Sequence, residues 1–167
     1  MITLFTILCL AVALLLLFKL ALIDLKTFLL PNKYVGLFFL TGIIFHGFAT
    51  DFETVSPSEA IAGFLAGGGL LLLVRYFANK HYKRDTLGLG DVKLMAAGGL
   101  WLGLSDIFLA ISLGAFFGLI HGVIYKFYMQ RKTKENVPLK GMIIPAGPGF
   151  ILGIVFIGIF KFHTLFV

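Results

Sequence analysis

Apolar residues fill six stretches of the 167-residue chain, and shorter polar or basic segments separate them. The six stretches are residues 2–23, 34–50, 60–77, 92–104, 107–128 and 142–160. Most of them are long enough to cross the hydrocarbon core of a bilayer, which is roughly 30 Å thick. The pattern therefore predicts an all-α fold, a polytopic bundle of six transmembrane helices.

Two of the predicted helices carry an acid near one end. The fourth stretch is short, because about 13 residues cover only roughly 20 Å. A start near Thr86 would restore its length and place Asp91 about a turn below the membrane surface. The first stretch can continue to Leu30, since Pro31 disfavours a helical conformation in the residue before it. Asp24 would then lie about two turns inside its helix, at a depth similar to that of Asp91.

The composition supports a membrane environment. Hydrophobic residues make up 59% of the chain, and only 13% of the residues are charged. A soluble domain of this size could not bury so much apolar surface, so the lipid bilayer is the expected solvent. No internal repeat or low-complexity segment divides the sequence, and residues 1–167 are expected to form a single membrane-embedded domain.

The basic residues predict the orientation in the membrane. Thirteen of the fourteen lysines and arginines lie in or beside the first, third and fifth connections, and only Lys161 lies elsewhere. The second and fourth connections carry acids instead. The positive-inside rule then makes connections one, three and five cytoplasmic and both termini extracytoplasmic. This distribution accounts for the net charge of +6 without a nucleic-acid partner. The expected location is the cytoplasmic (inner) membrane.

Neither a metal nor a cofactor is expected from the residue types. Cys9 is the single cysteine, and the four histidines are scattered without ligand spacing. Small residues recur at four-residue spacing within the apolar stretches, as in Gly63/Gly67, Gly99/Gly103, Gly114/Gly118/Gly122 and Gly149/Gly153. Such patterns favour close helix packing, either within one bundle or across a homodimer.

The candidate chemistry lies in Asp24 and Asp91, which 66 residues separate in the sequence. Ionisable side chains at membrane depth are costly and usually mark function. Two carboxylates held together in a low dielectric cannot both ionise easily, so one can activate water while the protonated partner polarises a carbonyl. Alternatively, each acid pairs separately with a lysine, Asp24 with Lys26 or Lys19 and Asp91 with Lys93. A proton or cation site in a small transporter or channel subunit would also use such acids.

The segment Gly88-Leu89-Gly90-Asp91-Val92-Lys93-Leu94 resembles the Gly-x-Gly-Asp signature of type IV prepilin peptidases, a class of intramembrane aspartyl proteases. Asp24 followed by Leu30-Pro31-Asn32 is similar to the family's first catalytic block. Ile144-Pro145-Ala146-Gly147-Pro148 is similar to its Ile-Pro-x-Gly-Pro motif at the start of the last helix. The three matches occur in the family's order, and together with the six apolar stretches they extend the resemblance over essentially the whole chain.

The resemblance implies roles for individual residues. Asp24 and Asp91 would be the catalytic pair, acting on water without a covalent intermediate. Gly88 and Gly90 would keep the backbone beside Asp91 open. Pro31 and Asn32 would shape the end of the first helix, and Pro145, Gly147 and Pro148 would shape the start of the last one. The expected substrates are precursors of type IV pilins and related pseudopilins, cleaved at the cytoplasmic membrane face.

The sequence also departs from the longer members of that family. Those carry paired Cys-x-x-Cys motifs in a region associated with N-methylation, whereas this chain has one cysteine and starts with an apolar stretch. A peptidase without methyltransferase activity is therefore expected, as in the short peptidases of tight-adherence pili or the archaeal preflagellin peptidases.

Two further polar side chains allow two interpretations each, and one aromatic side chain has a single expected role. Lys93 could orient Asp91 or extend to the membrane interface. His121 could make a polar contact between helices or take part in catalysis. Trp101, near the outer end of its stretch, is expected to be an interfacial anchor.

Overall fold

The computed structural model describes residues 2–49, 54–133, 145–163 and 165. Its elements are α1 (Ile2–Thr27), α2 (Asn32–Ile44), the π-helix η1 (Phe45–Ala49), α3 (Pro57–Tyr82), α4 (Leu89–Thr133) and α5 (Gly147–His163). The described part of the chain contains helices and no strand, which confirms the all-α prediction. Three segments, Leu4–Thr27, Pro57–Tyr82 and Leu89–Arg131, are long and apolar enough to cross a membrane, and α5 is a shorter apolar helix.

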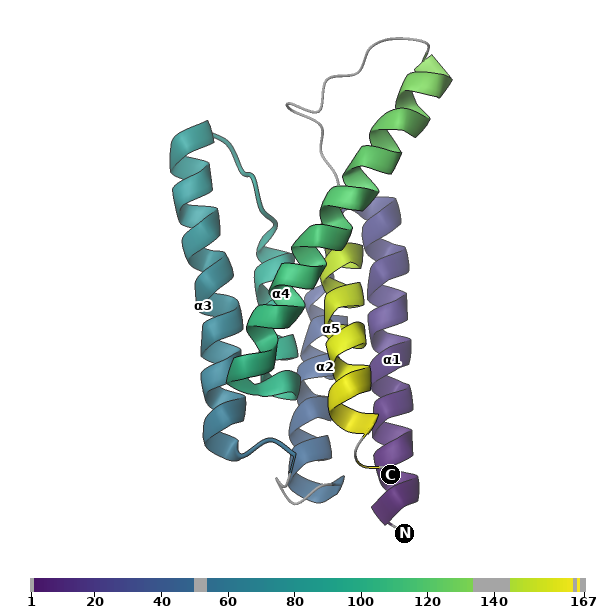
Figure 1. Ribbon diagram of the computed structural model, residues 1–167, viewed down its shortest axis with the longest axis vertical. Coiled ribbons are helices and arrows are strands. Elements are labelled where there is room, and N and C mark those ends of the chain that lie inside the picture. The colour runs from purple at the N-terminus through teal and green to yellow at the C-terminus, as the bar shows by residue number, and fades with distance from the viewer. Residues whose placement is uncertain (1, 50–53, 134–144, 164, 166–167) are drawn as a thin grey trace.

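A sharp break divides α4 into two arms. Gly103 has φ 79° and ψ 178°, a conformation that is essentially restricted to glycine. The arms fold back on each other, since Met95 and Ile107, from opposite sides of the break, both lie against Gly67. Figure 1 shows the reversal at the lower end of α4. The apolar pattern predicts this connection at residues 105–106, and the structure places it at Gly103 because only this residue tolerates the turn's backbone.

With α4 divided at Gly103, the described helices correspond in order to the six apolar stretches. The predicted start of the last stretch, residues 142–144, lies outside the described residues, and α5 begins at Gly147. The correspondence concerns the helical segments, and six membrane crossings remain a prediction.

Both acid-bearing helices are shorter at the ends that carry the acids than predicted. α1 ends at Thr27 because Phe28 adopts a left-handed conformation with φ 57°. Asp24 therefore lies in the last turn of α1, rather than two turns inside it. α4 begins at Leu89 instead of near Thr86, so Asp91 lies in the first turn.

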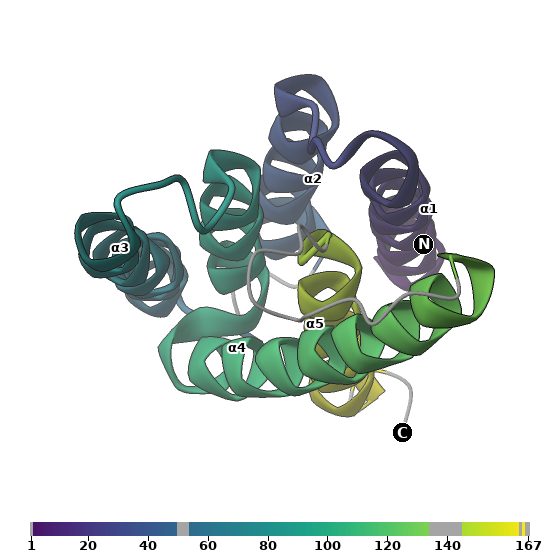
Figure 2. The same ribbon diagram turned by 90° about the horizontal axis from the view of Figure 1, so that it is seen from above.

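The helix ends next to the predicted motifs lie together at one end of the bundle. Figures 1 and 2 show the C-terminal end of α1 and the N-terminal ends of α2, α4 and α5 on this side. At the opposite end, Lys161 Nζ forms an ion pair of 2.7 Å with Asp106 Oδ2. This ion pair confirms that Lys161 and the fourth connection share one face, as the charge pattern predicts.

The glycine patterns serve packing within the chain. Gly63 lies against the backbone of Gly99 and Gly103, so that α3 and α4 meet without intervening side chains. Gly149 packs on Gly118 in the same way, where a Cβ at residue 149 would lie 2.7 Å from the Gly118 nitrogen. These contacts confirm close packing within one bundle. A homodimer through the same faces remains a prediction, and it would compete with these intrachain contacts.

Trp101 corrects another expectation. Its side chain is only 2% exposed, and its Nε1 donates a hydrogen bond of 2.9 Å to the Phe38 carbonyl. Its ring stacks on Phe38 at a centroid distance of 5.5 Å and also contacts Phe45 and Phe162. The predicted interfacial anchor is therefore wrong, because the indole N–H finds its acceptor inside the bundle.

We predict that Gly103→Ala lowers the stability of the bundle by about 1–3 kcal/mol, because alanine is strained in this backbone conformation. Gly69→Ala is the matched control, since Gly69 lies within α3 and an added Cβ would meet no atom within 4 Å. That control should leave stability unchanged or raise it by about 0.5–1 kcal/mol. Thermal unfolding in detergent measures both effects, and equal melting temperatures for the two variants would contradict the assigned role of Gly103.

Candidate active site

Asp24 and Asp91 are the two buried acids of the described residues, with 4% and 7% of their surfaces exposed. The ion pairs in the described part of the chain join Arg75 to Asp85 and Lys161 to Asp106. Neither buried acid is thus paired with a lysine, which excludes the alternative of two separate ion pairs for the described residues. An unpaired buried acid is costly and points to function.

Asp24 is held by the start of α5. Its Oδ2 accepts a hydrogen bond of 3.1 Å from the Gly147 backbone nitrogen, 123 residues further along the chain. A Cβ at Gly147 would lie 2.6 Å from the same oxygen, so this approach requires glycine. The free N–H groups and the positive end of the helix dipole at the start of α5 stabilise the carboxylate.

Asp91 lies at the start of α4 with spare hydrogen-bonding capacity. Its Oδ1 is buried and has no hydrogen-bond partner among the described residues. Its Oδ2 faces Gly88, where an added Cβ would lie 3.0 Å from the oxygen. The Asp24 carboxylate lies within electrostatic range of Asp91. The structure thus brings the two predicted acids into one region and leaves one carboxylate oxygen available.

Leu30 connects the three helix ends. A Cβ at Gly90 would lie 2.8 Å from the Leu30 Cβ, and a Cβ at Gly147 would lie 3.3 Å from the Leu30 Cδ1. The Leu30 side chain therefore contacts the starts of both α4 and α5. In the sequence, Leu30 comes shortly after the end of α1. This role of Leu30 was not predicted from the sequence, where the position of Leu30 directly before Pro31 was the available signal.

The other motif residues support this arrangement. Pro31 caps α2, and its carbonyl accepts a hydrogen bond of 3.1 Å from the Tyr34 nitrogen. Lys93 Nζ donates a hydrogen bond of 2.9 Å to Asn32 Oδ1, which joins the motif after α1 to the motif of α4. Lys93 therefore bonds to the other motif and not to Asp91. Pro145 is buried directly before α5, and Pro148 is half-buried in its first turn.

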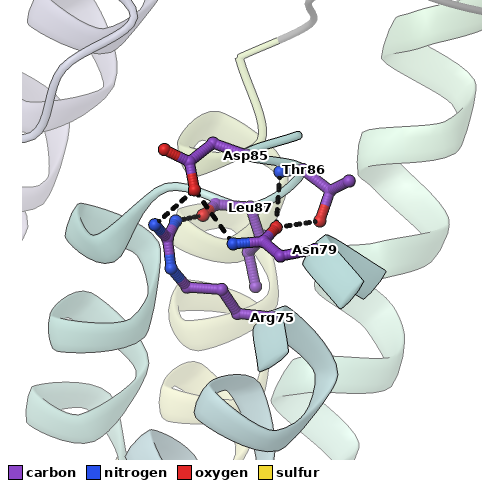
Figure 3. Close-up of polar contacts among 5 residues, drawn as sticks. All are labelled: Arg75, Asn79, Asp85, Thr86 and Leu87. Atoms are coloured by element: carbon purple, nitrogen blue, oxygen red, sulfur yellow. Dashed lines mark hydrogen bonds and ion pairs between the residues drawn. The ribbon is translucent and has the colours of Figure 1, made fainter. Parts of the chain in front are cut away.

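A polar network fixes the segment that leads into Asp91 (Figure 3). Arg75 of α3 donates to the Leu87 carbonyl and forms an ion pair of 2.7 Å with Asp85. Asn79 Nδ2 donates to Asp85 Oδ1 at 2.9 Å, and Asn79 Oδ1 accepts from both the nitrogen and the hydroxyl of Thr86 at 2.8 Å. The network anchors residues 85–87 to α3 immediately before Gly88. From the sequence, this region was predicted only to be a basic connection.

The fold and the site define a class of protein: a helical membrane protein with two buried acids where three helix ends meet. The sequence profile of the type IV leader peptidase family matches residues 9–123. The chain belongs to this family, as its motifs predicted.

Two curated relatives illustrate the similarity. The chain is 32% identical over 138 residues to a prepilin leader peptidase/N-methyltransferase of Pectobacterium carotovorum subsp. carotovorum, covering 82% of this chain and 46% of the relative. It is 27% identical over 134 residues to the enzyme of the same name from Escherichia coli K12, covering 80% and 55%. The chain thus spans about half the length of these relatives. No solved structure matches it.

We predict that Asn79→Ala loosens the segment before Asp91, because it removes one hydrogen bond to Asp85 and two from Thr86. Hydrogen–deuterium exchange of the 85–88 amides should become faster in this variant. The neighbouring Lys80→Ala, at an exposed position of the same helix, is the control and should leave exchange unchanged. Equal protection in Asn79→Ala and the parent protein would contradict an anchoring role of the network.

Proposed function

We propose that the chain is an intramembrane aspartyl endopeptidase that uses Asp24 and Asp91 to remove leader peptides from prepilin-type precursors. The observation that supports this most strongly is that two buried acids without a cationic partner, from α1 and α4, lie where the helix ends that carry the family's motifs come together. Both acids lie in the segment that the family profile covers.

In the proposed reaction a water molecule lies between the two carboxyl groups, one ionised and the other protonated. The ionised group takes a proton from the water as its oxygen bonds to the peptide carbonyl carbon, and the protonated group gives its proton to the carbonyl oxygen. When the resulting diol collapses, the ionised carboxylate takes a proton from one diol hydroxyl, the C–N bond breaks, and the nitrogen leaves with the proton of the other carboxyl group, which restores one ionised and one protonated acid. Asp91 Oδ1, which lacks a partner among the described residues, is available to hold the water.

The surrounding residues position this pair. The Gly147 amide fixes Asp24 through its hydrogen bond. The contact between Lys93 and Asn32 holds α2 against α4. Since both acids are more than nine-tenths buried, a peptide reaches them only after the helix ends separate. Leu30, which fills the space between Gly90 and Gly147, is the side chain that must move.

The substrate and the cellular setting follow from the family and the charge pattern. The relatives are named as prepilin leader peptidases, so the proposed substrate is a prepilin or pseudopilin precursor. The basic connections support six crossings of the cytoplasmic membrane, with the acids toward the cytoplasm and both termini outside. With a single cysteine, these 167 residues hold no Cys-x-x-Cys pair, and we propose peptidase activity without N-methylation.

We predict that Asp24→Asn and Asp91→Asn each abolish cleavage of a prepilin leader by purified protein in detergent. Each substitution keeps the side-chain shape but removes a group that must exchange protons. Asp106→Asn is the control, because Asp106 lies at the opposite end of the bundle in its ion pair with Lys161. It should cleave at the rate of the parent protein. Parental rates in either of the first two variants would contradict the two-acid mechanism.

The same assay separates the peptidase from a membrane protein that uses the acids as an ion site. Folded parent protein that cleaves none of several prepilin-type leaders would overturn the proposed function and favour a transporter.

A further inference from the structure

The second arm of α4, which follows the break at Gly103, packs one of its faces against α5. Gly153 packs on Ala110 and Gly114, and Gly149 packs on Gly114 and Gly118. The contacts move backward along α5 as they move forward along α4, so the two helices are antiparallel. Continued by one further turn along α4, this register leads us to expect His121 opposite the start of α5, where Gly147 holds Asp24.

A cavity supports this register. Gly118 and Ala115 of α4 line it together with Pro145 and Ala146, the two residues directly before α5. The next positions on the same face of α4 are residues 121 and 122, since residues three or four apart share a helix face. His121 thus lies on the side of α4 that faces the motif before Gly147.

The His121 side chain has an unused polar atom there. Its Nδ1 is buried and has no hydrogen-bond partner among the described residues. Its ring packs beside Tyr125 at a centroid distance of 6.4 Å. Asp24 and His121 also lie within electrostatic range of each other. A buried ring nitrogen without a protein partner needs an explanation, and a bound water is a common one.

We propose that His121 is a positioning residue of the active site, whose Nδ1 holds the Asp24 carboxylate in its reactive orientation through a shared water. The inference rests on the proposed function. Gly147 fixes Asp24 from the α5 side. His121 would fix it from the α4 side, so that the carboxylate is held from two directions while the substrate binds.

Kinetics of leader cleavage test this role. His121→Phe keeps a ring but loses both nitrogens, and it should lower kcat about 10- to 100-fold with little change in KM, as loss of a supporting contact does at other catalytic sites. His121→Gln, which keeps a polar group, should retain more activity. Added imidazole should restore part of the kcat of His121→Ala. His81→Phe, at the exposed end of α3, is the control and should match the parent.

Parental kcat in His121→Phe would overturn the proposal. Equal losses in the Phe, Gln and Ala variants, with no rescue by imidazole, would also overturn it, because they would show that His121 only fills space.

A second measurement does not depend on cleavage. The ¹⁵N resonances of the His121 ring should shift in Asp24→Asn and stay unchanged in Asp106→Asn. Unchanged resonances in both variants would overturn the contact between His121 and Asp24, even where the parent protein cleaves its substrate. If the His121 resonances shift in Asp24→Asn although the parent protein cleaves no leader, the contact is present and the proposed function is wrong.

Discussion

The structure depends on the burial of two carboxylates where the end of α1 meets the starts of α4 and α5. Burial of an acid without a cationic partner costs several kcal/mol, and the fold offsets this cost with helix N-termini. Asp91 lies in the first turn of α4, and Asp24 accepts a hydrogen bond from the first residue of α5. Two positive helix ends thus face the two acids, and this is possible only because Gly90 and Gly147 allow the backbones to come so close.

The end of the bundle that holds the two acids lies opposite an apolar and aromatic end. Trp101, Phe38, Phe45 and Phe162 form an aromatic cluster there, and the Lys161–Asp106 ion pair lies at the same end. The glycine contacts between α3 and α4 and between α4 and α5 join the two ends. At the acid-bearing end, Asp91 Oδ1 is buried without a hydrogen-bond partner among the described residues, and functional sites commonly keep such unsatisfied groups.

The sequence predicted the helical class, the two acids and the motifs around them, because each depends on residue type and spacing. It did not predict where α1 ends, since Phe28 adopts a conformation that phenylalanine rarely takes and nothing local signals it. The burial of Trp101 depends on a carbonyl 63 residues away. The contact of Leu30 with two glycines and the bond from Lys93 to Asn32 likewise arise only when distant segments pack. Long-range packing decides such features, and a single sequence does not encode it in any local pattern.

The central claim is that Asp24 and Asp91 share one site. Cross-linking tests it most directly, with Asp24→Cys and Asp91→Cys combined in a Cys9→Ser background and treated in membranes with a short bifunctional thiol reagent. The account predicts an intramolecular cross-link between positions 24 and 91, and none when Asp91→Cys is replaced by Asp106→Cys at the opposite end. Failure of positions 24 and 91 to cross-link, although each cysteine reacts with a monofunctional reagent, would contradict it.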